Sequence, residues 1–110
     1  MRYIARVLDN PEVKRLMVYS GSEGSFLFSY SFEEDGGCSG DWWFRSIEDA
    51  FATATERYHV QRSDWHTIPD PLADCQHDWI APARIPGRES GNPQWGKLEV
   101  LKDGIWVQVV

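Results

Sequence analysis

The sequence predicts an α+β fold in which an antiparallel sheet of about five or six strands packs against one main helix. Three observations lead to this prediction. The N-terminal third has extended segments separated by turn signals, residues 47–58 carry apolar side chains at helical spacing, and residues 95–110 form a hairpin pattern around "KDG". The length of 110 residues fits one domain, so we expect residues 1–110 to form a single α+β domain.

The first third of the chain is predicted to form a three-stranded meander. Strands are expected over residues 3–9, 13–20 and 25–33, separated by the turn signal "NPE" and the loop "GSEG". In the third strand, four aromatic residues alternate with other side chains, which places them on one face: Phe26, Phe28, Tyr30 and Phe32. Such a face requires a cover, and we expect helix 47–58 to supply it.

The predicted helix follows a pair of tryptophans. Residues 42–44 ("WWF") are expected to be extended, so that Trp42 and Trp43 point to opposite faces and only one enters the core. Ser46 is a suitable N-cap, with Asp49 three residues later. A narrow apolar stripe then follows, made of Ile47, Ala50, Phe51, Ala54 and Tyr58.

The last part of the chain contains fewer regular elements. A short strand is expected near "DWHTI" (64–68). Residues 72–94 are rich in proline, glycine and polar residues, which predicts a long connection with one short extended piece near Trp79 and Ile80. Residues 95–110 complete the predicted sheet with a C-terminal hairpin.

The net charge of −6 is concentrated in one part of the sequence. Residues 21–50 hold seven acids and one base, while the acids and bases elsewhere balance. This distribution disfavours nucleic acids and anionic membranes as partners, and it favours a basic protein. The acidic, glycine-rich segment 33–41 is expected to be an exposed, mobile loop. Its acids are the predicted partner-binding face: Glu33, Glu34, Asp35 and Asp41.

The segment "DWWFRSIEDAFATATERYHV" with the later "DW" resembles small uncharacterised bacterial domains, some of which are grouped with immunity proteins of polymorphic toxin systems. The resemblance covers about a quarter of the chain. It is carried by Trp43, Ser46, Glu48, Ala50, Ala54, Tyr58, Val60 and Trp65. The pattern usually has glycine after the tyrosine as a left-handed helix cap, whereas this chain has His59. The resemblance implies a partner-binding role and assigns no catalytic residue.

Candidate catalytic and metal-binding residues are few. Cys75 and His77, with Cys38, His59 or His66, have the residue types of a zinc site but lack the second closely spaced ligand pair. Cys75 and His77 could also act as nucleophile and base, which would require a thiol with a lowered pKa. The sequence favours neither, so we expect no catalytic residue, no metal and no cofactor.

Three functions remain after these considerations, of which an enzyme centred on Cys75 and His77 is the least favoured. The favoured one is a non-enzymatic module of a bacterial cytoplasm, monomeric or homodimeric, that binds a basic protein through its acidic face, as an immunity-type protein does. No secretion signal is recognised in "MRYIARVLDN", and both cysteines are expected to be reduced. The alternative uses the six tryptophans of the chain to bind a small molecule or carbohydrate. Its predicted surface contains Trp43, Trp79, Arg88 and Trp95.

Overall fold

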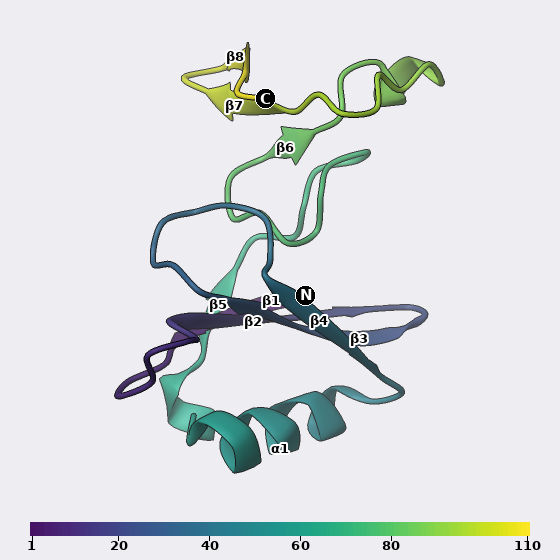
Figure 1. Ribbon diagram of the computed structural model, residues 1–110. Helices are drawn as coiled ribbons and strands as arrows, with labels where there is room; N and C mark the ends of the chain where they lie inside the picture. Colours follow the sequence, from purple (N-terminus) through teal and green to yellow (C-terminus); the bar gives the residue numbers. More distant parts are fainter. The chain divides into compact units, whose positions relative to one another are not determined.

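The computed structural model describes residues 1–110, which divide into two compact units, Met1–Asp70 and Pro71–Val110. The first unit contains a five-stranded antiparallel sheet and the α-helix (Figure 1), and the second contains a three-stranded sheet. The predicted α+β class, with an N-terminal meander, one main helix and a C-terminal hairpin, is confirmed. The hairpin belongs to the second sheet, and the single domain over residues 1–110 stays a prediction.

The five-stranded sheet has the strand order β4-β3-β2-β1-β5. Its strands are β1 (Arg2–Arg6), β2 (Arg15–Gly21), β3 (Gly24–Tyr30), β4 (Gly40–Phe44) and β5 (His66–Ile68). All neighbouring strands are antiparallel, and β5 pairs with β1 although the two are far apart in the sequence. The meander, the extended "WWF" segment and the strand near "DWHTI" are therefore confirmed.

Helix α1 spans Ile47–Tyr58, the predicted range. Ser46 is its N-cap and accepts a hydrogen bond of 3.2 Å from the backbone N–H of Asp49. His59 ends the helix in the left-handed conformation, with φ of 62°, and its backbone N–H donates to carbonyls of the last turn. The caps satisfy backbone groups that a helix leaves unpaired at its ends, which is why both ends are defined locally.

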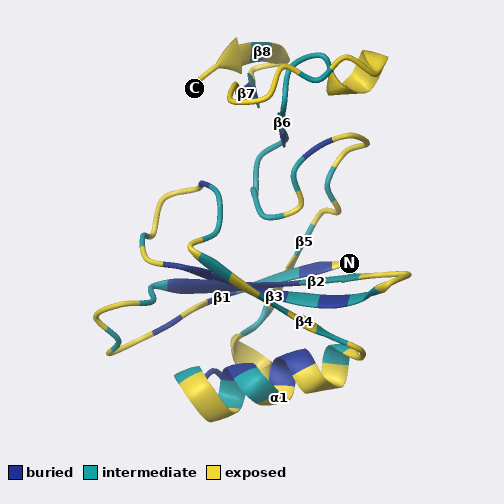
Figure 2. Ribbon diagram, turned by 45° about the vertical axis from the view of Figure 1, so that its right-hand side comes forward, coloured by how far each residue is buried: buried dark blue, intermediate teal, exposed yellow.

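The helix packs on the face of the sheet that has aliphatic side chains at its centre and Tyr3, Trp42 and Phe44 around them. Ala50, Phe51 and Ala54 are its buried residues (Figure 2), and they belong to one core with Val18 and Leu27. The predicted cover for the aromatic residues of β3 is therefore wrong. Alternation along a strand identifies two faces, but small aliphatic side chains on the neighbouring strands determine which face an alanine-rich helix can approach.

The aromatic residues of β3 lie on the sheet face opposite α1, called the far face below. Register places Phe28 opposite Met17, and Tyr30 opposite Arg15. Residues 31–39, the covering loop, lie on this side of the sheet (Figure 1), and the Phe32 ring packs edge-on against Tyr30 with centroids 6.1 Å apart. Glu33, Glu34 and Asp35 in this loop are exposed as expected, whereas Gly36 is buried.

The second unit contains β6 (Ala83–Arg84), β7 (Glu99–Lys102) and β8 (Ile105–Gln108), in the order β6-β7-β8. Asp103 and Gly104 join β7 to β8 with positive φ values of 51° and 77°, as a tight hairpin turn requires. The expected extended piece near Trp79 and Ile80 lies instead at Ala83–Arg84, because β7 supplies a pairing partner there.

Candidate functional site

A pocket of about 690 Å³ lies in the first unit, where β1 extends beyond its neighbour β5. Strand β5 pairs only with residues Arg2 to Ile4. The pocket is lined on one side by β1 and the residues that follow it, up to Asp9, and on the other by residues between Tyr58 and His66. Because β5 is short, the part of β1 that follows Ile4 has no strand partner at this edge of the sheet. A volume of this size suits a small organic ligand.

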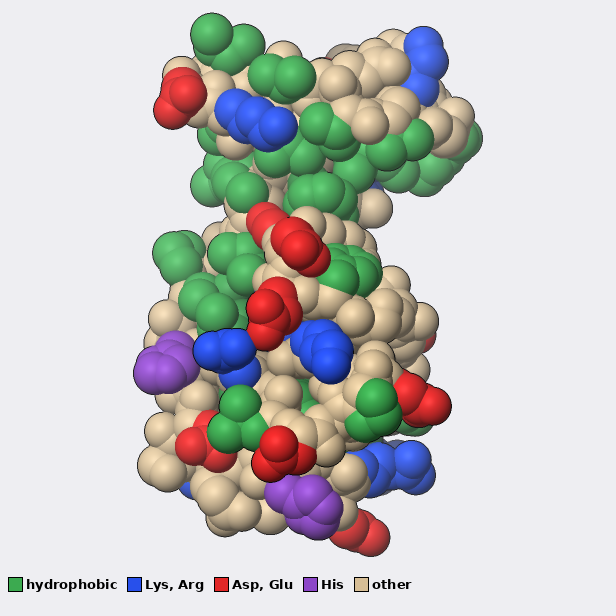
Figure 3. Space-filling view, turned by 60° about the vertical axis from the view of Figure 1, so that its left-hand side comes forward, with side chains coloured by type: hydrophobic (Ala, Val, Ile, Leu, Met, Phe, Trp, Pro, Cys, Tyr) green, Lys and Arg blue, Asp and Glu red, His purple; other side chains and the backbone are tan.

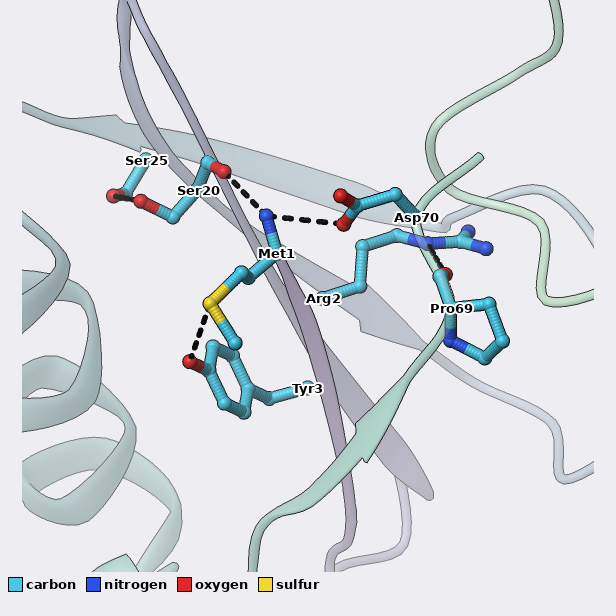
Figure 4. Close-up of polar contacts among 7 residues, drawn as sticks. All are labelled: Met1, Arg2, Tyr3, Ser20, Ser25, Pro69 and Asp70. Atoms are coloured by element: carbon cyan, nitrogen blue, oxygen red, sulfur yellow. Dashed lines mark hydrogen bonds and ion pairs between the residues drawn. The ribbon is translucent and has the colours of Figure 1, made fainter. Parts of the chain in front are cut away.

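Contacts at the start of β1 fix the position of β5 (Figure 4). The Nε of Arg2 donates a 2.8 Å hydrogen bond to the carbonyl of Pro69, just after β5. The N-terminal ammonium donates to the carbonyl of Ser20 and lies 3.1 Å from the Asp70 carboxylate. Burial lowers the pKa of the Arg2 guanidinium, although nearby acidic groups oppose this shift. These contacts hold the last residues of the unit against β1.

The backbone of β1 is open on the pocket side. The N–H of Val7 donates to the carbonyl of Lys14, so the peptide groups of Val7 point toward the β2 side. Antiparallel strands alternate the direction of their hydrogen bonds, so Arg6 points its peptide groups toward the other side. No residue of β5 pairs with Arg6. The pocket is therefore bordered by a short unpaired length of strand.

The opposite wall begins at the C-terminal end of α1. Tyr58, His59 and Val60 line the pocket, and the left-handed cap at His59 turns the chain there. The carbonyl of Val60 accepts a 2.6 Å hydrogen bond from the Thr55 hydroxyl. Asp64 also lines the pocket, and its Oδ2 accepts a 2.8 Å hydrogen bond from the Gln61 N–H. The wall is thus fixed by local hydrogen bonds.

Two arginines line the pocket, and they differ in their partners. Arg6 is exposed and forms an ion pair of 2.8 Å with Glu33. Arg15 is only 5% exposed, and its guanidinium lies 3.9 Å above the centre of the Tyr30 ring. Its Nη2 donates to the backbone carbonyl of Glu34 at 3.3 Å, while Nε and Nη1 are buried without a hydrogen-bond partner. Arg15 therefore has no carboxylate partner.

The acids predicted from the sequence are distributed over two elements. Glu33, Glu34 and Asp35 are exposed in the covering loop, where Glu33 is paired with Arg6 and an oxygen of Asp35 accepts from the Gly36 N–H. Asp41 is exposed on β4, opposite Phe28. On the face shown in Figure 3, acidic and basic side chains are interspersed. In the folded unit, basic side chains from other segments therefore lie among the acids that the sequence concentrates in residues 21–50.

The predicted aromatic surface is divided between the two units. Trp43 is 52% exposed on β4, and its Nε1 donates to the carbonyl of Glu23 at 3.2 Å. In the second unit, Trp79 is partly buried, Arg88 donates to the Gln76 side chain, and Trp95 is 73% exposed. None of these four residues lines the pocket. As predicted, Trp42 and Trp43 point to opposite faces, and it is Trp42 that packs against the core.

The cysteine hypothesis required a thiol with a lowered pKa. Cys75 is buried, and this burial raises the pKa of its thiol above the ordinary value of 9.0, despite an opposing effect of Arg84. A raised pKa reduces the fraction of thiolate, which is the form that acts as a nucleophile.

The structure contains no group of three or more His, Cys, Asp or Glu side chains placed to hold a metal ion. None of its helices has the length and apolar character needed to cross a membrane.

Sequence reasoning did not identify the pocket. Its residues come from positions 4–15 and 58–66, which no single motif connects. The one available signal was His59, a bulky residue at a left-handed cap, which marks the start of the second wall.

Comparison of the chain with protein-family models, curated proteins and solved structures found no match. The resemblance to immunity proteins therefore stays a prediction, and the fold and pocket define the class as a small α+β protein.

Proposed function

We propose that the protein is a non-enzymatic binding module that engages a basic protein segment along strand β4. The observation that carries this proposal is Trp43, a large aromatic side chain half exposed on an edge strand, two residues after the exposed Asp41. Buried aromatic anchors with a polar rim contribute most of the binding energy in many interfaces. The cytoplasmic location and bacterial source remain part of the same proposal.

Strand β4 offers both backbone and side-chain contacts. It forms one edge of the sheet, so one side of its backbone has no strand partner. An extended segment of a partner can add to such an edge through main-chain hydrogen bonds. Trp43 and Asp41 point to the far face, opposite Phe26 and Phe28 respectively. A partner strand paired with β4 would therefore present alternate side chains to both residues.

The charge of this surface favours a basic partner. Neither Asp41 nor Glu23, whose carbonyl accepts from Trp43, forms an ion pair within the chain. Glu34 in the covering loop also lacks an ion pair, and its carbonyl lies at Arg15 of β2, so the acids at β4 itself are Asp41 and Glu23. Lysine or arginine side chains of a partner strand would neutralise these carboxylates and speed its association.

The first experiment measures binding of two synthetic peptides of equal length, one alternating lysine with valine and one alternating glutamate with valine. We expect the basic peptide to bind and to weaken as salt rises, because exposed charges are screened. Trp43→Ala should weaken it by about tenfold or more, as expected for an aromatic anchor. The matched control is Trp95→Ala, which removes an exposed tryptophan of the second unit.

Charge is tested separately from the aromatic contact. Asp41→Asn keeps the size of the side chain and should reduce both the affinity for the basic peptide and its salt dependence, while Glu56→Gln on the exposed side of α1 should change neither. Equal binding of the basic and acidic peptides, or full affinity in Trp43→Ala, would contradict the proposal. A basic protein captured from the source organism by the wild-type chain but not by Trp43→Ala would identify the partner.

A further inference from the structure

We propose that the pocket beside β1 binds a small, mainly apolar molecule that carries a single carboxylate, with Arg15 as the group that recognises this charge. The site lies beside β1 and β5, whereas the surface proposed for the partner lies on β4 at the opposite edge of the sheet. The inference is thus independent of the proposed protein-binding function.

The shape and the apolar lining of the pocket suit an organic ligand. Its volume of about 690 Å³ lies within the range of ligand sites. Ile4, Ala5, Leu8 and Val60 supply apolar lining, and Leu8 is 73% exposed. A ligand with an apolar body would remove the Leu8 side chain from water, which is favourable in proportion to the area buried.

The buried guanidinium of Arg15 would be stabilised by an anion bound in the pocket. A buried charge is costly unless it is paired and hydrogen-bonded. The Tyr30 ring and the Glu34 carbonyl compensate part of this cost, but no carboxylate of the chain contacts Arg15, and two of its nitrogen atoms lack acceptors. A ligand carboxylate held in the pocket beside Arg15 would balance this charge, and a shift of the guanidinium toward it would bring the two buried nitrogen atoms to an acceptor.

The other charged groups favour one negative charge over two. Arg6 is already paired with Glu33. Asp9 and Asp64 also line the pocket and would repel a second negative charge. His59 and His66 line it as well and offer ring nitrogens to a polar part of the ligand. A monocarboxylate therefore fits this set of side chains better than a phosphate ester does.

The test compares 4-phenylbutyrate with its uncharged amide and with phenylpropyl phosphate, using the whole chain and calorimetry or NMR titration at constant pH and salt. We expect the carboxylate to bind about tenfold or more tightly than the amide, because only the carboxylate pairs with the guanidinium. It should also bind more tightly than the phosphate ester. Arg15→Met should bring the carboxylate and amide affinities close together, whereas Arg57→Met, a change on α1 outside the pocket lining, should keep them apart.

A second variant gives an answer even if Arg15→Met does not fold. Leu8→Glu places a negative charge at an exposed position of the lining, so it should weaken the carboxylate several-fold and affect the amide less. The proposal is overturned if the wild-type chain binds carboxylate and amide equally, or binds neither at about 10 mM, a concentration that detects even very weak sites. Tighter binding of the phosphate ester would overturn the preference for a single charge.

Discussion

The two faces of the five-stranded sheet are stabilised in different ways. The face toward α1 is apolar, with Leu16, Val18 and Leu27 at its centre in one core with Ala50, Phe51 and Ala54 of the helix. The far face buries Arg15 against the Tyr30 ring and Arg2 with a hydrogen bond to the Pro69 carbonyl, and it is partly covered by a loop. One alternating sequence pattern can therefore support both arrangements. Aliphatic packing accepts a helix at close range, whereas buried guanidinium groups need ring faces and carbonyls.

The largest effect is expected at Leu27, which has no exposed surface on the helix face. Leu27→Ala should reduce the free energy of unfolding by about 2–5 kcal/mol, because it leaves a cavity in the core. Its neighbour Phe26 points to the far face and is only partly buried, so Phe26→Ala should cost less. Urea denaturation of the two variants measures the difference. A greater loss for Phe26→Ala would reverse our ranking of the two faces.

The next largest loss of stability is expected at Ser46, the N-cap of α1. Ser46→Ala removes the acceptor for the Asp49 N–H and should cost about 1 kcal/mol. Ser22→Ala, an exposed change in the turn between β2 and β3, serves as the control and should be nearly neutral. Thermal and urea unfolding would check both variants. If the two serine changes had equal effects, the cap would not stabilise the helix.

A smaller effect of opposite sign is expected at the other end of the helix. His59→Gly should raise the free energy of unfolding by about 0.5 kcal/mol, because glycine adopts the left-handed conformation without the steric cost of a side chain. His59→Ala keeps that cost and should not stabilise the protein. Any stabilisation by the alanine variant would show that the imidazole, not the backbone, is unfavourable there.

The smallest effect is expected on the far face. Arg15→Met replaces a buried charge with an apolar side chain of similar length, and it should leave the free energy of unfolding unchanged or raise it by less than about 0.5 kcal/mol. Arg15→Ala leaves space unfilled and should be destabilising. The same urea series measures both variants. A large loss in Arg15→Met would mean that the guanidinium contacts with Tyr30 and Glu34 are essential for holding the covering loop.

The features that could be predicted from the sequence are those with local causes. The limits of α1 follow from Ser46 and from the residues after Tyr58, and the final hairpin follows from its turn residues. The face that α1 covers depends on side chains of neighbouring strands, such as Val18, and alternation within β3 alone does not contain this information. The pocket depends on the length of β5 relative to β1, a property of strand pairing that no single segment specifies.

The first residue of β3 has a consequence for how related chains would vary. Gly24 has a φ of 124°, and a Cβ atom built on it would lie 2.5 Å from the Nε1 of Trp43. A side chain at position 24 and an indole in this orientation at position 43 therefore exclude one another. We expect the two positions to co-vary during evolution, so that a lineage gaining a side chain at 24 would also lose or turn away the exposed tryptophan.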